Sequence, residues 1–457
     1  MIPELNKDSK TPLYVQIYEQ LSYNINNGII KSGAKLPSQR RLADDLGVSV
    51  NTIINAYDML ARYDYVAAED RSGYYVKERE IPEKPGPEKR WHSDAPSIYN
   101  FSKNGVDLKM SDEFRKSFRR VVKTITDGDF SYPDYTGEYE LRKQICSMLN
   151  KSWGIVCAPT QIVVGASLIY LIDSLIKVIG SDLVYGFENP AYYKLSNYVR
   201  LGEYKTTYMN VFADGLNSDT LKDLDADALF LMPYHHYPLS YAMTDEQKNA
   251  VLSWAGDDRY IIEYGLNMEY LYTRPVKPLY SATENKNVIF ISDFTRTVSP
   301  NCNVAYLVLP ESLVKRWQEV YLSYHSAASK LEQYFIIEIL RNGSYYRNVA
   351  RLRKLYNKKR ERLISAIRSH PLSDRIKILN SESGACLLIE PQTDCDSDVL
   401  IDECHKAGVK LSYIKNALEQ PNGLISPRTY ILGFGELSES EIKNGAKLLL
   451  DTWGNLM

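Results

Sequence analysis

The sequence predicts a multi-domain protein with two unlike parts: a small N-terminal helical region ending in a hairpin, and a large α/β body with a smaller α+β portion. Three observations predict this. The first 77 residues carry short helical patterns around a GVS turn. From about residue 100, helical stretches alternate with short apolar runs, which is typical of a parallel or mixed sheet covered by helices. Between them, residues 78–98 hold four prolines among alternating charges.

The proline-rich segment 78–98 predicts a semi-extended linker, because its composition disfavours a packed element. The alternative is a surface loop inside one domain. The linker is the favoured prediction, since the sequence patterns before and after this segment are of different types. We therefore expect domains at 1–77 and 99–457, the second with a large portion at about 99–340 and a small one at about 341–457.

The bulk composition indicates a soluble globular chain. Of its 457 residues, 44% are hydrophobic and 25% are charged, as is usual for such proteins. No apolar run is long enough to span a membrane, and the first residues lack the apolar core of a signal peptide. The six cysteines are scattered without a CxxC pair, which favours reduced thiols. We expect a cytoplasmic protein that has no membrane partner.

Net charge and histidine spacing bear on two functional classes, nucleic-acid binding and metal binding. The net charge of −2 gives no overall signature of nucleic-acid binding, so any DNA contact has to come from a local patch. His235 and His236 are adjacent, but no HxxxH or HExxH spacing occurs. We predict no metal site.

The first helix is predicted within TPLYVQIYEQLSYNINNGII. Leu13, Ile17, Leu21 and Ile25 recur every four residues and would form one apolar helix face.

Two further helices follow in close order. Ser38 is placed to cap the helix in SQRRLADDLG, Gly47 ends it, and Ser49 is placed to cap SVNTIINAYDMLARYD. This is the spacing of a helix-turn-helix, in which the glycine permits the sharp turn. YVAAEDRSGYYV then gives two short strand-like runs around a polar turn that contains Gly73. That hairpin is a candidate wing.

The ordered pattern LPSQRRLADDLGVSVNTIINAYDML, preceded by PLYVQIYEQL and followed by SGYYV, resembles the winged-helix DNA-binding domain of GntR-type bacterial regulators. The resemblance covers about residues 11–77 and implies a double-stranded DNA operator as partner. The alternative is that the three helices serve only to pack against one another.

Candidate DNA contacts lie at the N-terminal end of the second helix of this unit, which enters the major groove in such motifs. Asn51 can read adenine with two hydrogen bonds, while hydroxyl groups can contact bases or phosphates. Arginines early in the preceding helix and at the wing tip are suited to phosphates or the minor groove. Val50 departs from the family, where arginine or lysine is common. The predicted DNA-binding residues are Ser38, Arg40, Arg41, Ser49, Asn51, Thr52, Arg71 and Gly73.

The body is predicted from six apolar runs: QIVVGAS, SDLVYGF, ADALFLMP, RYIIEYG, NVIFISD and VAYLVLP. Farther along, KRERLISAIRSH, ACLLIE and TYILGF suggest the smaller α+β portion.

The order of motifs over about residues 100–455 resembles a fold-type I aminotransferase. YPDYTGEYELRKQI, FENPAYY, MPYHHYPLS, RYIIEYGLNMEYLY and NVIFISDFTRTVSPNCNVAYLVLP each match a family motif in place. A GntR-like head joined to such a body is the arrangement of MocR-type regulators. The resemblance implies an α/β aminotransferase fold of type I, a homodimer and, in active relatives, pyridoxal phosphate.

The residues that serve the cofactor in the family are replaced here. Arg296 takes the place of the lysine that holds pyridoxal phosphate, and a guanidinium cannot serve as that nucleophile. Tyr264 takes the place of the acid beside the pyridine nitrogen. Leu266 replaces a tyrosine, Asn303 the phosphate-binding arginine and Ile431 the arginine that clamps substrate. We therefore predict no catalytic residues and no covalent cofactor.

Several readings of the degenerate pocket stay open. Arg296 can bind an anionic ligand with help from Thr295, Ser167 and the backbone of GAS, or it can pair with Asp293 or Glu263. Pyridoxal phosphate or an adduct can bind without a covalent link as an effector, and an active aminotransferase is the least favoured alternative. The predicted pocket residues are Gly165, Ala166, Ser167, Tyr192, His236, Tyr264, Leu266, Thr295, Arg296, Asn303 and Ile431.

Overall fold

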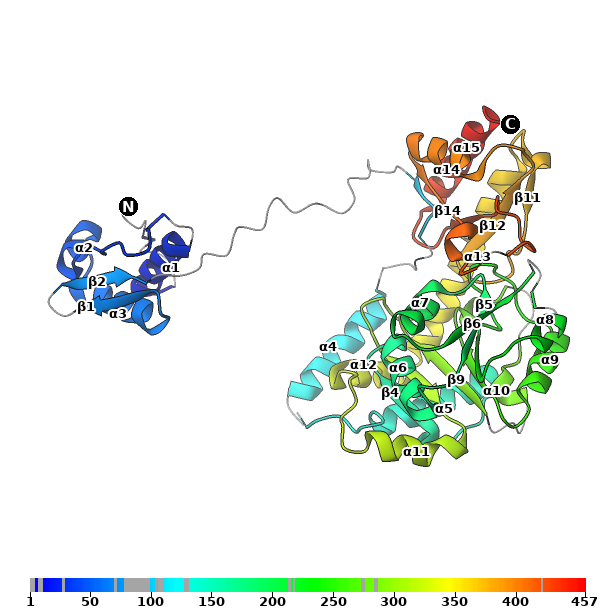
Figure 1. Ribbon diagram of the computed structural model, residues 1–457, viewed down its shortest axis with the longest axis horizontal. Coiled ribbons are helices and arrows are strands. Elements are labelled where there is room, and N and C mark those ends of the chain that lie inside the picture. The colour runs from blue at the N-terminus through cyan, green and yellow to red at the C-terminus, as the bar shows by residue number, and fades with distance from the viewer. Residues whose placement is uncertain are drawn as a thin grey trace. The chain divides into compact units, whose positions relative to one another are not determined.

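The computed structural model describes most of the chain, in two compact units that comprise Met1–Ser93 and Asp94–Met457 (Figure 1). The described residues are 5–6, 11–26, 29–69, 72–77, 99–103, 105, 110–126, 131–212, 215–216, 218–272, 276–282, 287–420 and 422–457. The predicted linker 78–98 and Arg71 at the predicted wing tip lie outside them.

The first unit, the head, is a three-helix bundle with a hairpin. Its helices are α1 (Leu13–Asn26), α2 (Gln39–Leu46) and α3 (Val50–Arg62), and its strands are β1 (Val66–Glu69) and β2 (Gly73–Val76). The strands pair antiparallel, with Val66 opposite Val76. Ile17, Leu21 and Ile25 are buried as their spacing predicts, and they form one core with residues of α2 and α3, whereas Leu13 is only partly buried. The predicted winged-helix fold is confirmed.

The second unit, the body, is built on a seven-stranded mixed sheet with the order β4-β10-β9-β8-β7-β5-β6. Strands β5 to β9 run parallel to their neighbours within that group, and β10 is antiparallel to both β4 and β9. The six apolar runs form all strands but edge strand β6. The strands are β4 (Ile162–Gly165), β5 (Tyr185–Asn189), β6 (Thr206–Asn210), β7 (Ala228–Leu231), β8 (Tyr260–Tyr264), β9 (Val288–Asp293) and β10 (Ala305–Val308).

Helices cover both faces of this sheet. Ile162 and Val164 of β4 pack into an apolar cluster with residues of α5 and α12. Val163, which lies between them, packs into a different cluster with α6 and α11, as alternation along a strand requires. The helices are α4 (Asp112–Thr126), α5 (Tyr139–Trp153), α6 (Leu168–Ile179), α7 (Tyr193–Leu201), α8 (Ser218–Lys222), α9 (Asp245–Ala255), α10 (Leu279–Ala282), α11 (Glu311–Tyr321) and α12 (Lys330–Arg341).

The C-terminal portion has a four-stranded sheet with the order β11-β12-β15-β14, which packs with the long helix α13. Its elements are α13 (Ser344–Arg368), β11 (Ile376–Ile378), β12 (Cys386–Pro391), α14 (Ser397–Lys406), β13 (Val409–Lys410), β14 (Ser412–Tyr413), β15 (Tyr430–Gly433) and α15 (Glu439–Gly454). Short 3₁₀ turns lie at Pro159–Gln161, Met268–Tyr270, Ser373–Arg375 and Ile414–Ala417.

The predicted start of the large portion at about residue 99 is wrong. Strand β3 (Tyr99–Asn100) pairs parallel with β13, and Phe101 is buried in the apolar cluster of the C-terminal portion. The described chain after residue 98 therefore starts in the small portion before it contributes to the large one. Two residues of edge pairing carry too little pattern to be assigned from sequence.

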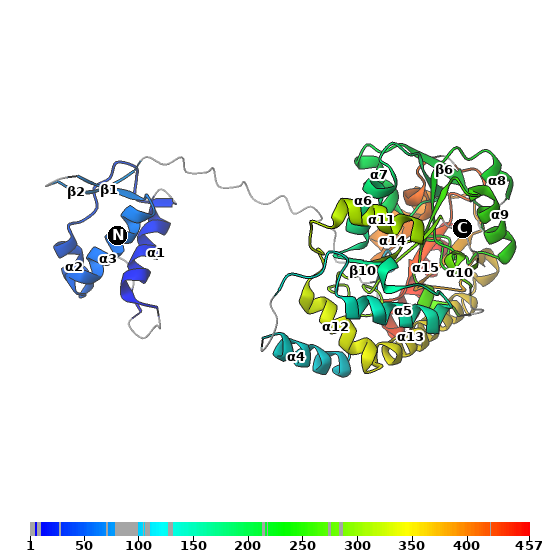
Figure 2. The same cartoon turned by 90° about the horizontal axis from the view of Figure 1, so that it is seen from below.

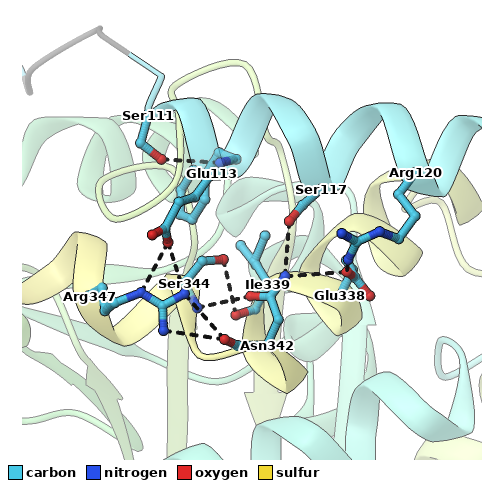
Figure 3. A network of polar contacts seen from close by, with 10 residues as sticks. Ser111, Glu113, Ser117, Arg120, Glu338, Ile339, Asn342, Ser344 and Arg347 are labelled. Atoms are coloured by element: carbon cyan, nitrogen blue, oxygen red, sulfur yellow. Dashed lines mark hydrogen bonds and ion pairs between the residues drawn. The ribbon is translucent and has the colours of Figure 1, made fainter.

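Helix α4 lies beside α12 (Figure 2), and a polar network ties it to the turn between α12 and α13 (Figure 3). Arg347 donates through Nη2 to Glu113 Oε2 at 2.9 Å, and Asn342 Nδ2 donates to Ser117 Oγ at 3.0 Å. An ion pair joins Arg120 and Glu338. These contacts reinforce the apolar packing of Phe114 on Phe335.

No helix in the described part of the chain combines the length and the apolar character needed to cross a bilayer.

Candidate functional site

In the head, the turn between α2 and α3 is built by two capping serines and one glycine. Ser38 accepts a hydrogen bond from the Arg41 N–H at 3.3 Å, and Ser49 accepts one from the Thr52 N–H at 3.2 Å. Gly47 has φ 59°, in the left-handed region where a side chain is strained. The caps and the turn are confirmed, so α3 begins with its N-terminal residues at the surface.

The polar residues at the start of α3 fall into two kinds. The hydroxyl groups of Ser49 and Thr52 lie 2.8 Å apart and bond to each other. Asn51 is exposed, and within the described residues its side chain has no hydrogen-bond partner. The amide of Asn51 is thus available to a base edge, whereas one of the two hydroxyl protons is already used in the bond between Ser49 and Thr52.

Cations border this surface. Arg40 and Arg41 are exposed on α2, and the Arg41 side chain is 78% exposed, 3.9 Å from Asp45. Gly73 begins strand β2 with φ 122°. Lys35, which the sequence reading missed, lies with its amine 5.5 Å from the centre of the Tyr75 ring on the same strand. Its signal is weak, because it stands in the loop before the first capping serine.

In the body, a pocket of about 400 Å³ gathers six of the eleven predicted pocket residues, and we call it the Arg296 pocket. A neighbouring hollow of about 480 Å³, the Ile431 pocket, shares Tyr192, Lys194 and Arg296 with it and reaches Ile431. The predicted residues that line the Arg296 pocket are Ser167, Tyr192, Tyr264, Thr295, Arg296 and Asn303.

Arg296 lies in the turn that follows β9. The carboxylate of Asp293, the last residue of β9, accepts a hydrogen bond from the Thr295 N–H at 2.9 Å and another from the Thr295 hydroxyl. The hydroxyl of Tyr270 donates to the Arg296 carbonyl at 2.7 Å. These bonds fix the turn, so the side chain of Arg296 projects from a rigid support.

Two tyrosines and one carboxylate surround the guanidinium of Arg296. Tyr264 donates to Asp293 Oδ2 at 2.8 Å, and the rings of Tyr192 and Tyr264 lie 6.0 Å apart. Burial opposes the charge of Arg296, but Tyr192, Tyr264 and Asp293 outweigh it and raise the pKa of its guanidinium. Burial raises the pKa of Tyr192 to about 12 even though Arg296 lowers it. Arg296 is therefore a fixed cation between neutral phenols, and it faces one acid.

Glu263, the other acid considered as a partner of Arg296, is occupied elsewhere. It accepts hydrogen bonds from the Tyr234 hydroxyl at 2.7 Å and from the backbone N–H groups of Leu279 and Tyr280 at 2.8 and 2.9 Å. Of the two candidate acids, only Asp293 lines the Arg296 pocket.

Four predicted pocket residues line neither pocket. Gly165 ends β4, and Ala166 separates it from Ser167, which accepts from the Tyr170 N–H at 3.1 Å and caps α6. Leu266 is 2% exposed within an apolar cluster. His236 is fully buried and stacked on Tyr241, with its Nε2 atom 3.6 Å from Glu188 Oε2.

Some pocket residues were missed by the sequence reading. Lys194 is exposed in the first turn of α7 and lines both pockets. Its signal was its place two residues after Tyr192 in the NPAYYK run. Glu436 lines the Arg296 pocket from the C-terminal portion, and no local sequence pattern predicts this position. Arg428, the arginine three residues before Ile431, lines neither pocket.

Comparisons with known proteins agree with both units. Residues 13–76 match the family described as bacterial regulatory proteins, gntR family. Over 468 aligned residues the chain is 27% identical to the HTH-type transcriptional regulator YdeL of Bacillus subtilis (strain 168), covering 99% of both chains. It is 24% identical to the probable rhizopine catabolism regulatory protein MocR of Rhizobium meliloti, covering 89% of this chain and 87% of that protein.

The body shares its fold with solved aminotransferases. An archaeal alanine:glyoxylate aminotransferase superposes with a TM-score of 0.68 at 20% identity, over 79% of this chain and 91% of that one. The gntR-family head, the full-length regulator relatives and this body fold match the arrangement predicted above. These findings together support a MocR-type regulator. As such the chain is a DNA-binding transcriptional regulator with an aminotransferase-like body, and the two surfaces described above are its candidate operator-binding and ligand-binding sites.

Proposed function

We propose that this MocR-type regulator binds paired operator half-sites as a homodimer, and that its body is a catalytically inactive aminotransferase fold that senses a small ligand. One observation carries the loss of catalysis. Arg296 occupies the rigid turn after β9, and its guanidinium keeps its charge at any physiological pH. Such a group cannot attack a carbonyl carbon as an amine does.

The surroundings of Arg296 do not fit a covalently held pyridoxal phosphate either. The position that the family resemblance gives to the acid beside the pyridine nitrogen is Tyr264, whose hydroxyl donates to Asp293. The position of the substrate clamp is Ile431, which is 4% exposed and apolar. Lys194 offers an amine, but it projects from the first turn of α7 rather than from the turn after β9.

The pocket itself supports a sensing role. It holds about 400 Å³ and is bordered by the cations Arg296 and Lys194 and by the acids Asp293 and Glu436. Opposite charges around one small pocket suit a compact ligand that carries both an anionic and a cationic group, because each charge gains a partner on binding. A ligand shifts the balance of regulator states only by binding one of them more tightly.

A second candidate is non-covalent binding of pyridoxal phosphate or an adduct as the effector. The N-terminus of the twelve-residue helix α6 lines the Arg296 pocket through Ser167, Leu168 and Ile169, and helix N-termini favour anions such as phosphate. Isothermal titration with the free cofactor separates the two candidates. Saturable binding that Arg296→Ala weakens supports the cofactor as effector, whereas absence of heat supports a different ligand.

Replacing Arg296 by lysine tests the loss of catalysis. We expect no measurable transaminase turnover with pyridoxal phosphate and any common amino acid, because Tyr264 and Ile431 still cannot provide the partners of ring nitrogen and substrate carboxylate. Wild-type protein is the matched control, assayed with a keto-acid acceptor and product detection by mass spectrometry. Turnover in the single variant would show that the site needs only its lysine, and the proposal of a degenerate pocket would be wrong.

A further inference from the structure

Two cysteines that are eleven positions apart lie side by side in the body. Cys157 Sγ is 3.5 Å from Cys146 Sγ. Cys146 comes from α5, and Cys157 from the short segment between α5 and the turn Pro159–Gln161. The cysteines are scattered in the sequence, but the reversal of the chain at Gly154 returns Cys157 to the helix.

We propose that Cys146 and Cys157 are a modification site, a dithiol that peroxides oxidise to an intramolecular disulfide. A disulfide has an S–S distance of about 2.0 Å, so the two sulfur atoms need to approach by only about 1.5 Å. Both cysteines are partly exposed, and the neighbouring Val156 is 75% exposed. A small oxidant therefore reaches the pair without unfolding of the body.

The surroundings make one sulfur the better nucleophile. The hydrogen bond from the Cys157 thiol lowers the pKa of Cys146, with a smaller contribution from the guanidinium of Arg142. The pKa of Cys157 is raised by the same hydrogen bond and by burial. Cys146 thus ionises first and attacks the oxidant, since the thiolate is the reactive form.

The other four cysteines differ from this pair in burial or in proximity to a second thiol. Burial raises the pKa of Cys386 to about 11 and that of Cys302 and Cys404 to about 12. All three are buried, whereas Cys395 is partly exposed like the pair. Exposure alone therefore does not single out Cys146 and Cys157, and their proximity does.

The chemistry balances with hydrogen peroxide as the oxidant. The Cys146 thiolate attacks one peroxide oxygen, the O–O bond breaks, and the products are a sulfenic acid and, after protonation, water. The Cys157 sulfur then attacks the Cys146 sulfur, the S–O bond breaks, and a second water leaves. Two electrons pass from the two sulfurs to the peroxide, which is reduced to two waters.

The cross-link would join α5 to the segment that leads into β4. Arg142 already bridges these parts, because it donates to the carbonyls of Gly137 and Pro159 at 2.9 Å each. At its other end β4 leads to Ser167 at the Arg296 pocket. Oxidation therefore tightens one support of that pocket, and this inference holds whether or not the pocket binds an effector.

The test treats the full-length protein with hydrogen peroxide and maps disulfides by mass spectrometry after alkylation of the remaining thiols. We expect one peptide pair joined through Cys146 and Cys157, four alkylated thiols instead of six, and a melting temperature raised by several degrees that dithiothreitol reverses. Cys146→Ser and Cys157→Ser should both lose the cross-link and the thermal shift, whereas the control Cys395→Ser should keep them.

Two results would overturn the proposal: six alkylated thiols after peroxide, or a disulfide through any other pair of cysteines. Mapping in the wild-type protein decides the matter even if a serine variant folds poorly. Over-oxidation of Cys146 to a sulfinic acid with Cys157 still reduced would also count against it, because it means that the second sulfur does not reach the first.

Discussion

Replacing Asn51 by alanine lowers specific operator affinity by about 5- to 150-fold and leaves binding to random duplex nearly unchanged. The amide of Asn51 is exposed at the start of α3, where side chains meet base edges in helix-turn-helix complexes. A good base contact is worth about 1–3 kcal/mol of discrimination, which sets the expected range. Fluorescence anisotropy on a duplex selected from a randomised pool measures the change.

Arg40→Ala should behave differently, because a phosphate contact carries no sequence information. We expect weaker binding to selected and random duplexes alike, with the slope of log affinity against log salt reduced by about 0.9. Asp58→Ala is the matched control, because Asp58 is exposed on the later part of α3. This variant should change the affinity for neither the selected nor the random duplex. Equal losses of specific and random binding in Asn51→Ala would show that α3 does not read bases.

Replacing Glu188 by glutamine should stabilise the body at alkaline pH. Burial raises the pKa of Glu188 to about 7, although hydrogen bonds from Tyr241 and Met232 lower it. Because the folded protein then holds this proton more tightly than the unfolded chain, its contribution to stability is lost as pH rises from about 4.5 through 7. At pH 8 the glutamine variant should melt several degrees higher, equivalent to about 2–3 kcal/mol.

The groups that face Glu188 are compatible with the amide. Tyr241 donates to Glu188 Oε1 at 2.6 Å, and burial lowers the pKa of His236 to about 3, so that this neighbour stays neutral. Thermal unfolding at pH 5 and pH 8 measures the effect, and Glu319→Gln on the exposed face of α11 is the control. If the advantage of glutamine were the same at both pH values, Glu188 would not titrate in the folded protein as argued.

Much of the fold could be predicted because its signals are local. The capping serines, Gly47 and the spacing of Ile17, Leu21 and Ile25 fix the head, and six apolar runs became buried strands. Strand β6 was missed because four of its five residues at the sheet edge are only partly buried, so that it forms no apolar run. Pairing of Tyr99 with Val409 joins distant segments, which no local pattern reveals.

The candidate site shows the same limit. Motif order led to Tyr192, Tyr264 and Arg296, which the structure brings to one pocket. It did not lead to Lys194 or Glu436, because their place depends on how α7 and the C-terminal portion approach that pocket. Proximity of Cys146 and Cys157 likewise depends on a chain reversal, and spacing alone does not encode it.

The central claim is that the body holds no covalent pyridoxal phosphate. Its most direct test incubates the purified full-length protein with the cofactor, reduces it with borohydride and measures the intact mass and the visible spectrum. We predict an unmodified mass and no absorption band beyond that of free cofactor. A mass increase equal to one reduced cofactor, attached to a lysine such as Lys194, would contradict the claim.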